Sequence, residues 1–156
     1  MTTLNVQGAV TSDGIQENVC VEIADGVIRN ISPSHTECLP GILIPGFVDL
    51  HCHGGGGYSF DNGVEVKAAA DFHAKHGTTT VIASLVSNPV DQQITRLEAL
   101  KPLVENGTIG GVHMEGPFLS HHRCGAQNPA VITAPSRDDI APVSYTHLTL
   151  PTNREV

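Results

Sequence analysis

The sequence is poor in aromatic residues: it has no tryptophan, two tyrosines and four phenylalanines among 156 residues. Its core must therefore be built mainly from Val, Ile, Leu and Ala, and its 16 glycines and 10 prolines are typical of a turn-rich globular chain. Basic residues are also scarce, because 8 Lys and Arg stand against 16 Asp and Glu, giving a net charge of −8. They are scattered singly and form no stripe that could neutralise phosphates, which argues against a nucleic-acid partner.

Targeting and membrane-spanning segments are missing from the sequence as well. Its first residues, MTTLNVQGAVTSDG, contain neither the basic nor the apolar region of a signal peptide. The longest apolar runs, such as residues 81–86, are too short to cross a bilayer. The four cysteines are far apart and form no CxxC pair, which favours reduced thiols. We therefore expect a cytoplasmic protein.

The first part of the sequence is rich in β-forming residues. Residues 4–10, 19–24 and 27–31 are predicted strands, and Asp25-Gly26 lies between the last two. This dipeptide is a strong hairpin signal because both residues tolerate positive φ. We expect a small, mostly antiparallel sheet in a first domain, residues 1–44.

Strands and helices alternate in the second part, residues 45–141. The pattern predicts strands at 47–50, 78–85 and 109–114, and helices at 64–75 and 92–104. Pro102 is expected to kink or end the second helix because it lacks a backbone donor. Continuous apolar strands separated by helices indicate parallel βαβ units, so the fold class is α/β. Polar residues follow the strands, as in a (β/α)8 TIM-type barrel, but three strands cannot close one, and we expect a truncated barrel.

The last residues, 142–156, match neither pattern and have an unusual possible origin. One DNA reading of residues 143–152 is GTC TCT TAT ACA CAT CTG ACG CTG CCG ACG, which corresponds to the transposon end and adapter of a common sequencing-library chemistry. The same frame accounts for Pro142 and for the residues up to Val156 and a stop codon. We therefore expect this tail to be an artefact and the natural frame to continue beyond Ala141.

The end of the first barrel strand carries the clearest chemical signal, His51-Cys52-His53 followed by four glycines. Alternate side chains of a strand share a face, so the two imidazoles are expected to project together while Cys52 points away. Two imidazoles at a strand end can share a metal ion. Asp49 is expected to face away from this metal, in a structural role.

A carboxylate follows the third barrel strand, in the run Gly-Val-His-Met-Glu-Gly-Pro-Phe. Glu115 offers a hard oxygen ligand suited to Zn²⁺, Fe²⁺ or a similar divalent ion. His113 shares its face but is expected to pack behind the ligands. Among the remaining histidines, His121 and His122 are expected at the rim, and His73 and His76 on the helical surface.

Together these motifs resemble the amidohydrolase superfamily and, within it, the N-acetylglucosamine-6-phosphate deacetylases. The matching stretches are PGFVDLHCHGGGG, HGTTTVIASLVSNP and GVHMEGPFLSHHRCGAQNPA, in the family's order and spacing. The resemblance implies a barrel plus a small β-sandwich to which residues 1–44 contribute. It implies one or two divalent metal ions held by Glu115, His51 and His53, and substrate contacts from Ala126 and from Gln127, where other members often have His.

The activity implied by the resemblance is metal-assisted hydrolysis of the acetamide of N-acetylglucosamine 6-phosphate, giving glucosamine 6-phosphate and acetate. The family's catalytic Asp and two further metal-binding histidines would lie beyond Ala141. We therefore expect no catalytic residue in this polypeptide, which would be inactive alone, and a homo-oligomer for the full-length protein. The alternatives are another amidohydrolase, acting on a cyclic amide, and a non-functional truncated product. A dihydroorotase-like enzyme typically has Arg after its HxH motif, where this sequence has glycines.

Overall fold

The computed structural model describes residues 1–61 and 63–141. The chain divides into two compact units, one formed by Met1–Gly46 and one that begins at Phe47. The expected artefact tail, residues 142–156, lies outside the described residues.

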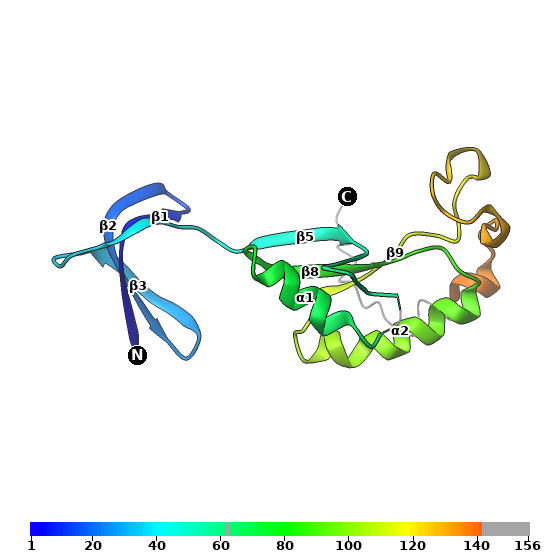
Figure 1. Cartoon of the computed structure of the whole chain (residues 1–156), viewed down its shortest axis with the longest axis horizontal. Coiled ribbons are helices and arrows are strands. Elements are labelled where there is room, and N and C mark those ends of the chain that lie inside the picture. Colours follow the sequence, from blue (N-terminus) through cyan, green and yellow to red (C-terminus); the bar gives the residue numbers. More distant parts are fainter. Residues whose placement is uncertain (62, 142–156) are drawn as a thin grey trace. The chain divides into compact units, whose positions relative to one another are not determined.

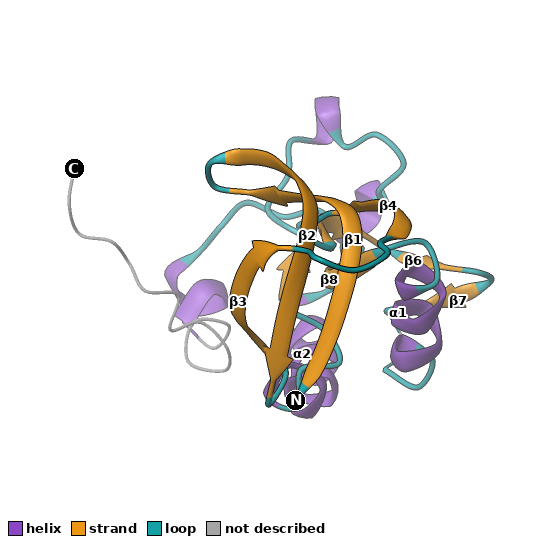
Figure 2. Cartoon of the chain, turned by 90° about the vertical axis from the view of Figure 1, so that its left-hand side faces the viewer, coloured by secondary structure: helices purple, strands orange, loops and turns teal. Residues whose placement is uncertain are grey.

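The first unit is a four-stranded sheet. Its strands are β1 (Thr2–Thr11), β2 (Gly14–Ala24), β3 (Val27–Pro33) and β4 (Leu39–Leu43), in the order β3-β2-β1-β4. The three predicted strands are confirmed, and β1, β2 and β3 form an antiparallel meander that Figure 2 shows face on. The sequence did not predict β4, which pairs with β1 in the parallel direction.

The predicted hairpin between β2 and β3 is also present. Asp25 and Gly26 have φ angles of 54° and 72°, the left-handed conformation that the sequence indicated. The buried apolar residues of this sheet are Val6, Ala9, Val19 and Val21, which form one small cluster.

The second unit contains a three-stranded parallel sheet (Figure 1). Its strands β5 (Phe47–Cys52), β8 (Thr78–Leu85) and β9 (Gly111–Met114) follow one another in the order β5-β8-β9. Helix α1 (Val66–Ala74) connects the first pair and α2 (Val90–Glu105) the second. The shorter elements are the hairpin β6 (Gly54–Gly55) and β7 (Tyr58–Ser59) and the 3₁₀ turns η1 (His121–Arg123) and η2 (Pro129–Val131). The predicted βαβ alternation is confirmed.

Two details of the helices differ from the sequence prediction. Helix α1 is shorter than residues 64–75 at both ends. Pro102 does not end α2, which continues to Glu105. The proline lacks only a donor: its carbonyl still accepts the Asn106 N–H at 3.0 Å, so the last turn of the helix closes normally.

Both helices pack on the same face of the parallel sheet. The alternate β8 residues Val81, Ala83 and Leu85 lie in one buried cluster with Val66 and Ala69 of α1 and with Leu97 and Leu100 of α2. Because strand side chains alternate, Ser84 must point to the other face. That second face receives the polar residues at the carboxyl ends of the strands. Within residues 1–61 and 63–141, no helix is long and apolar enough to span a membrane.

Candidate metal centre

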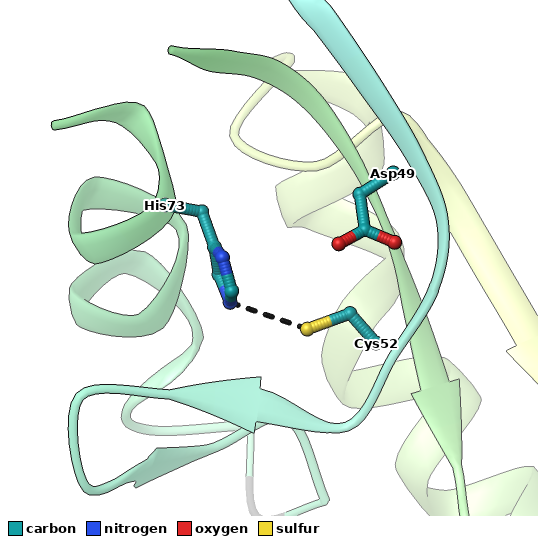
Figure 3. Close-up of side chains that lie close together, drawn as sticks. All are labelled: Asp49, Cys52 and His73. Carbon is teal, nitrogen blue, oxygen red and sulfur yellow. Dashed lines mark hydrogen bonds between the residues drawn. The ribbon is translucent and has the colours of Figure 1, made fainter. Parts of the chain in front are cut away.

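Strand β5 directs its chemical groups to two opposite sides. Asp49 pairs with Val81 and Cys52 with Ala83, so β5 uses three residues where β8 uses two. This irregularity shifts the alternation by one residue. Asp49 and Cys52 therefore lie together on the side of α1 (Figure 3). This agrees with the expectation that Asp49 faces away from the metal held by the two histidines.

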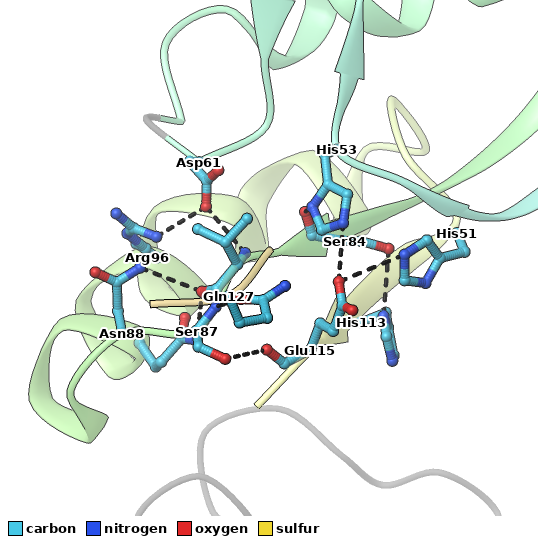
Figure 4. A network of polar contacts seen from close by, with 12 residues as sticks. His51, His53, Asp61, Ser84, Ser87, Asn88, Arg96, His113, Glu115 and Gln127 are labelled. Atoms are coloured by element: carbon cyan, nitrogen blue, oxygen red, sulfur yellow. Dashed lines mark hydrogen bonds and ion pairs between the residues drawn. The ribbon is translucent and has the colours of Figure 1, made fainter. Parts of the chain in front are cut away.

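His51 and His53 meet Glu115 on the side away from the helices (Figure 4). The Nε2 atom of His53 lies 2.9 Å from Glu115 Oε2, and that of His51 lies 3.5 Å from the same oxygen. These three ligand atoms all lie within 4.8 Å of one another. The structure thus brings together the three residues that the sequence predicted as metal ligands, although Glu115 follows His53 by 62 residues.

Backbone pairing fixes the position of the carboxylate. The Glu115 N–H donates to the Leu85 carbonyl at 3.0 Å, which continues the β8–β9 ladder one residue beyond Met114. The Glu115 side chain is 32% exposed and those of His51 and His53 are 52% and 38% exposed. The cluster is therefore partly shielded but open to a small molecule.

The hydrogen bonds of His53 support the binding of a cation. Its Nδ1 atom lies 2.9 Å from the carbonyl oxygen of Ser84. A carbonyl only accepts, so Nδ1 carries the proton, and in the neutral ring Nε2 then presents a lone pair to Glu115. Two lone pairs at 2.9 Å repel each other unless a proton or a cation lies between them. A backbone carbonyl on the far nitrogen is also the usual arrangement of a metal-binding histidine.

The donor set fits a divalent transition metal. Two imidazole nitrogens and one carboxylate oxygen are the ligand types of catalytic Zn²⁺ sites, which keep a further position for water or substrate. Iron(II) accepts the same ligands. The residues present are therefore suited to the ion that the sequence predicted.

His113 lies beside this cluster without joining it. Its ring centroid is 5.0 Å from that of His51, and its Nδ1 atom is 3.3 Å from the hydroxyl of Ser84. Ser84 is fully buried and thus contacts His53 through its carbonyl and His113 through its side chain. This agrees with the packing role expected for His113.

The loop after β8 joins the carboxylate to the segment expected to contact substrate. The Ser87 hydroxyl donates to the Glu115 carbonyl, and the Ser87 N–H donates to Gln127 Oε1, both at 2.7 Å. Gln127 thus lies near the metal-ligand cluster, whereas Ala126 is exposed. The substrate contacts of these two residues stay predictions.

An ion pair holds the same loop from the other side. Arg96 of α2 donates to Asp61 Oδ1 at 2.8 Å, and the Val86 N–H lies 3.3 Å from the same oxygen. Both charged side chains are about one quarter exposed. Sequence reasoning missed this pair and both serines. The polar residues directly after β8 were the available signal for Ser87, since barrel enzymes place functional groups there.

Four histidines of α1 and η1 and their flanking residues differ in exposure. His121 and His122 are exposed in η1, and His76 is exposed after α1, as expected. The surface position expected for His73 is wrong. Its ring is partly buried, with Nε2 at 3.0 Å from the Gly54 carbonyl, because the glycine turn after β5 folds onto α1.

Replacing Ser87 with alanine should destabilise the protein by about 1–3 kcal/mol, because the Glu115 carbonyl would lose its donor in a nearly buried position. Denaturant unfolding of the two proteins measures this difference. Ser120→Ala is the matched control: Ser120 is exposed, and its removal should change stability by less than about 0.5 kcal/mol. Equal effects of the two substitutions would contradict a role for Ser87 in fixing Glu115.

No protein-family model matches the chain, but curated proteins and solved structures do. The chain is 31% identical to N-acetylglucosamine-6-phosphate deacetylase of Bos taurus, a match covering 76% of this chain and 31% of the relative. It is 24% identical to N-acetylgalactosamine-6-phosphate deacetylase of Shewanella sp., over 78% of this chain and 34% of the relative. The chain thus spans about a third of the length of these relatives.

The fold gives the same result. A solved structure of a variant N-acetyl-D-glucosamine-6-phosphate deacetylase from Mycobacterium smegmatis, in complex with N-acetyl-D-glucosamine-6-phosphate, matches with a TM-score of 0.83 and 31% identity. The match covers 93% of this chain and 40% of that one. The described residues therefore have the α/β fold of an amidohydrolase. Within that class, the chain is homologous to the amino-terminal part of N-acetylglucosamine-6-phosphate deacetylases.

Proposed function

We propose that the protein is a metal-dependent deacetylase that hydrolyses the acetamide of N-acetylglucosamine 6-phosphate to glucosamine 6-phosphate and acetate. The observation that carries this proposal is the convergence of His51, His53 and Glu115 at the carboxyl ends of parallel strands. The matching structure has this sugar phosphate bound, which supports the choice of substrate.

The proposed architecture is a (β/α)8 barrel with a small β-sandwich. Three parallel strands with both helices on one face are the arrangement of successive barrel units. The metal ligands lie on the opposite face, which would be the barrel interior. The sheet of β1 to β4 would belong to the sandwich, to which the sequence resemblance assigns residues 1–44.

His51, His53 and Glu115 would hold the divalent ion, Zn²⁺ or Fe²⁺. Such an ion supplies Lewis-acid activation of water and of the amide carbonyl. The protein groups fix the ligands: the Ser84 carbonyl sets the proton of His53 on Nδ1, and the Ser87 hydroxyl holds the backbone of Glu115. These contacts keep the donor atoms aimed at one point before substrate arrives.

The segment of Ala126 and Gln127 would contact the sugar. Since Gln127 Oε1 accepts the Ser87 N–H, the amide nitrogen of this side chain is the group that can donate to a substrate oxygen. Arg123 is exposed in η1, three residues before Ala126, and is a basic group suited to the rim of the site. That the complete protein is a homo-oligomer stays a prediction.

The full-length protein should prefer N-acetylglucosamine 6-phosphate to free N-acetylglucosamine by roughly ten- to a hundredfold in kcat/KM. A charge-assisted contact with the phosphate dianion is worth about 1.5–3 kcal/mol, which corresponds to this factor. Steady-state release of acetate from the two sugars measures the preference. N-acetylgalactosamine 6-phosphate is the matched control, because it keeps the phosphate and the acetamide and differs only at one hydroxyl.

Equal kcat/KM for phosphorylated and free sugar would contradict the proposed substrate and leave the metal site in place. A higher kcat/KM for the galactosamine derivative would move the specificity to that sugar, which is the substrate named for the Shewanella relative.

A further inference from the structure

A second group of possible metal ligands lies between β5 and α1 (Figure 3). It consists of Asp49 and Cys52 of the strand and His73 of α1, whose ligand atoms all lie within 4.8 Å of one another. We propose that these three side chains bind a Zn²⁺ ion, with the carbonyl oxygen of Gly54 as the fourth donor. This site is separate from the centre formed by His51, His53 and Glu115 and shares no ligand with it.

The distances among the donors are those of a closely packed set. Cys52 Sγ lies 3.2 Å from His73 Nε2, and both atoms lie 3.0 Å from the Gly54 carbonyl oxygen. In a tetrahedral zinc site, with bonds of roughly 2.0–2.3 Å, neighbouring donors are about 3.3–3.6 Å apart. The three distances among Cys52 Sγ, His73 Nε2 and the Gly54 carbonyl oxygen would each have to increase by only a few tenths of an ångström to accept the ion.

The local backbone is shaped to bring these donors together. Gly54 has a φ of 143°, which an L side chain rarely adopts. A Cβ on Gly55 would lie 2.5 Å from His73 Nε2, so the turn can approach the imidazole only because this residue is glycine. The irregular pairing of β5 with β8 also contributes to the site, because it puts Asp49 on the same side of the strand as Cys52.

The donor chemistry suits zinc. Thiolate sulfur, imidazole nitrogen and carboxylate oxygen are its three common protein ligands. Asp49 accepts the His51 N–H through Oδ1 at 3.1 Å, which leaves its other oxygen for the ion. Binding would release the thiol proton of Cys52 to solvent and move the ring proton of His73 to Nδ1. All three side chains are partly buried. The ion would join β5 to α1, because Asp49 and Cys52 belong to the strand and His73 to the helix.

Cobalt(II) substitution of the metal-stripped natural gene product tests the site directly, since a Co²⁺–thiolate bond gives a charge-transfer absorption that nitrogen and oxygen ligands do not. We expect the intensity of this absorption to correspond to one thiolate-bound Co²⁺ per chain, in addition to the Co²⁺ of the first centre. The absorption should be lost in Cys52→Ser and retained in Cys124→Ser, a matched control at a cysteine that follows η1. His73→Gln, which keeps the thiol, should raise the Kd for this absorption by at least about tenfold.

Glu115→Gln separates this site from the first centre. The thiolate absorption should persist in that variant, because Glu115 lies on the other side of β5. Circular dichroism confirms that each variant is folded. The proposal would be overturned by the absence of any thiolate absorption, by its survival in folded Cys52→Ser, or by its loss in Glu115→Gln. None of these results depends on which sugar the protein deacetylates.

Discussion

Replacing Glu115 with glutamine is expected to remove the metal of the first centre and to lower kcat/KM for acetamide hydrolysis by at least about a hundredfold. Loss of an outer contact to a metal ligand already costs roughly 10- to 100-fold, and Glu115 is proposed as a ligand itself. The amide is neutral and would no longer offset the charge of the ion. Elemental analysis and steady-state kinetics of the natural gene product measure the two effects.

Glu98→Gln is the control for this experiment. Glu98 is an exposed residue of α2, and its substitution removes the same charge without touching the centre. We expect unchanged metal content and activity in this variant. Wild-type metal content at the first centre of Glu115→Gln would refute the assignment of Glu115 as a ligand.

Replacing Leu85 with alanine should destabilise the protein by about 2–5 kcal/mol, the range found when a large core side chain is truncated. Leu85 is fully buried in the cluster that α1 and α2 form against β8. Its carbonyl also accepts the Glu115 N–H, so loosening this residue should weaken metal binding as well. Denaturant unfolding and metal titration of the natural gene product measure both consequences.

Val64→Ala is the matched control, because Val64 is 87% exposed. Its truncation should change the free energy of unfolding by less than about 0.5 kcal/mol. Similar unfolding midpoints for Leu85→Ala and wild type would show that the β8 core does not support the site as described.

Much of the fold follows from local sequence patterns. Apolar runs bounded by turn residues predicted the strands of the parallel sheet. Asp25-Gly26 predicted the β2–β3 hairpin of the first unit, because the required φ is positive. Strand β4 was missed since its residues pair with β1, more than 25 residues away, and no local pattern indicates such a partner. Pro102 does not end α2, because its carbonyl still accepts the Asn106 N–H, while the kink that the sequence indicated as the other outcome stays a prediction.

The candidate site was predictable to the extent that it depends on strand alternation. His51 and His53 share a face for this reason, and Glu115 follows β9, a strand of the same parallel sheet that β8 separates from β5. The contacts of Ser84 and Ser87 were not predictable, because they join side chains to backbone carbonyls of other segments. The position of His73 was missed because it depends on how closely the glycine turn approaches α1.

Removal and restoration of the metal test the central claim most directly. The natural gene product, treated with a chelator and then dialysed, should release no acetate from N-acetylglucosamine 6-phosphate. Addition of Zn²⁺ or Fe²⁺ should restore formation of acetate and glucosamine 6-phosphate in equal amounts, and it should fail to do so in Glu115→Gln. Acetate release at the original rate by the metal-free protein, or full restoration in Glu115→Gln, would contradict a metal-dependent deacetylase whose ion is held by this residue.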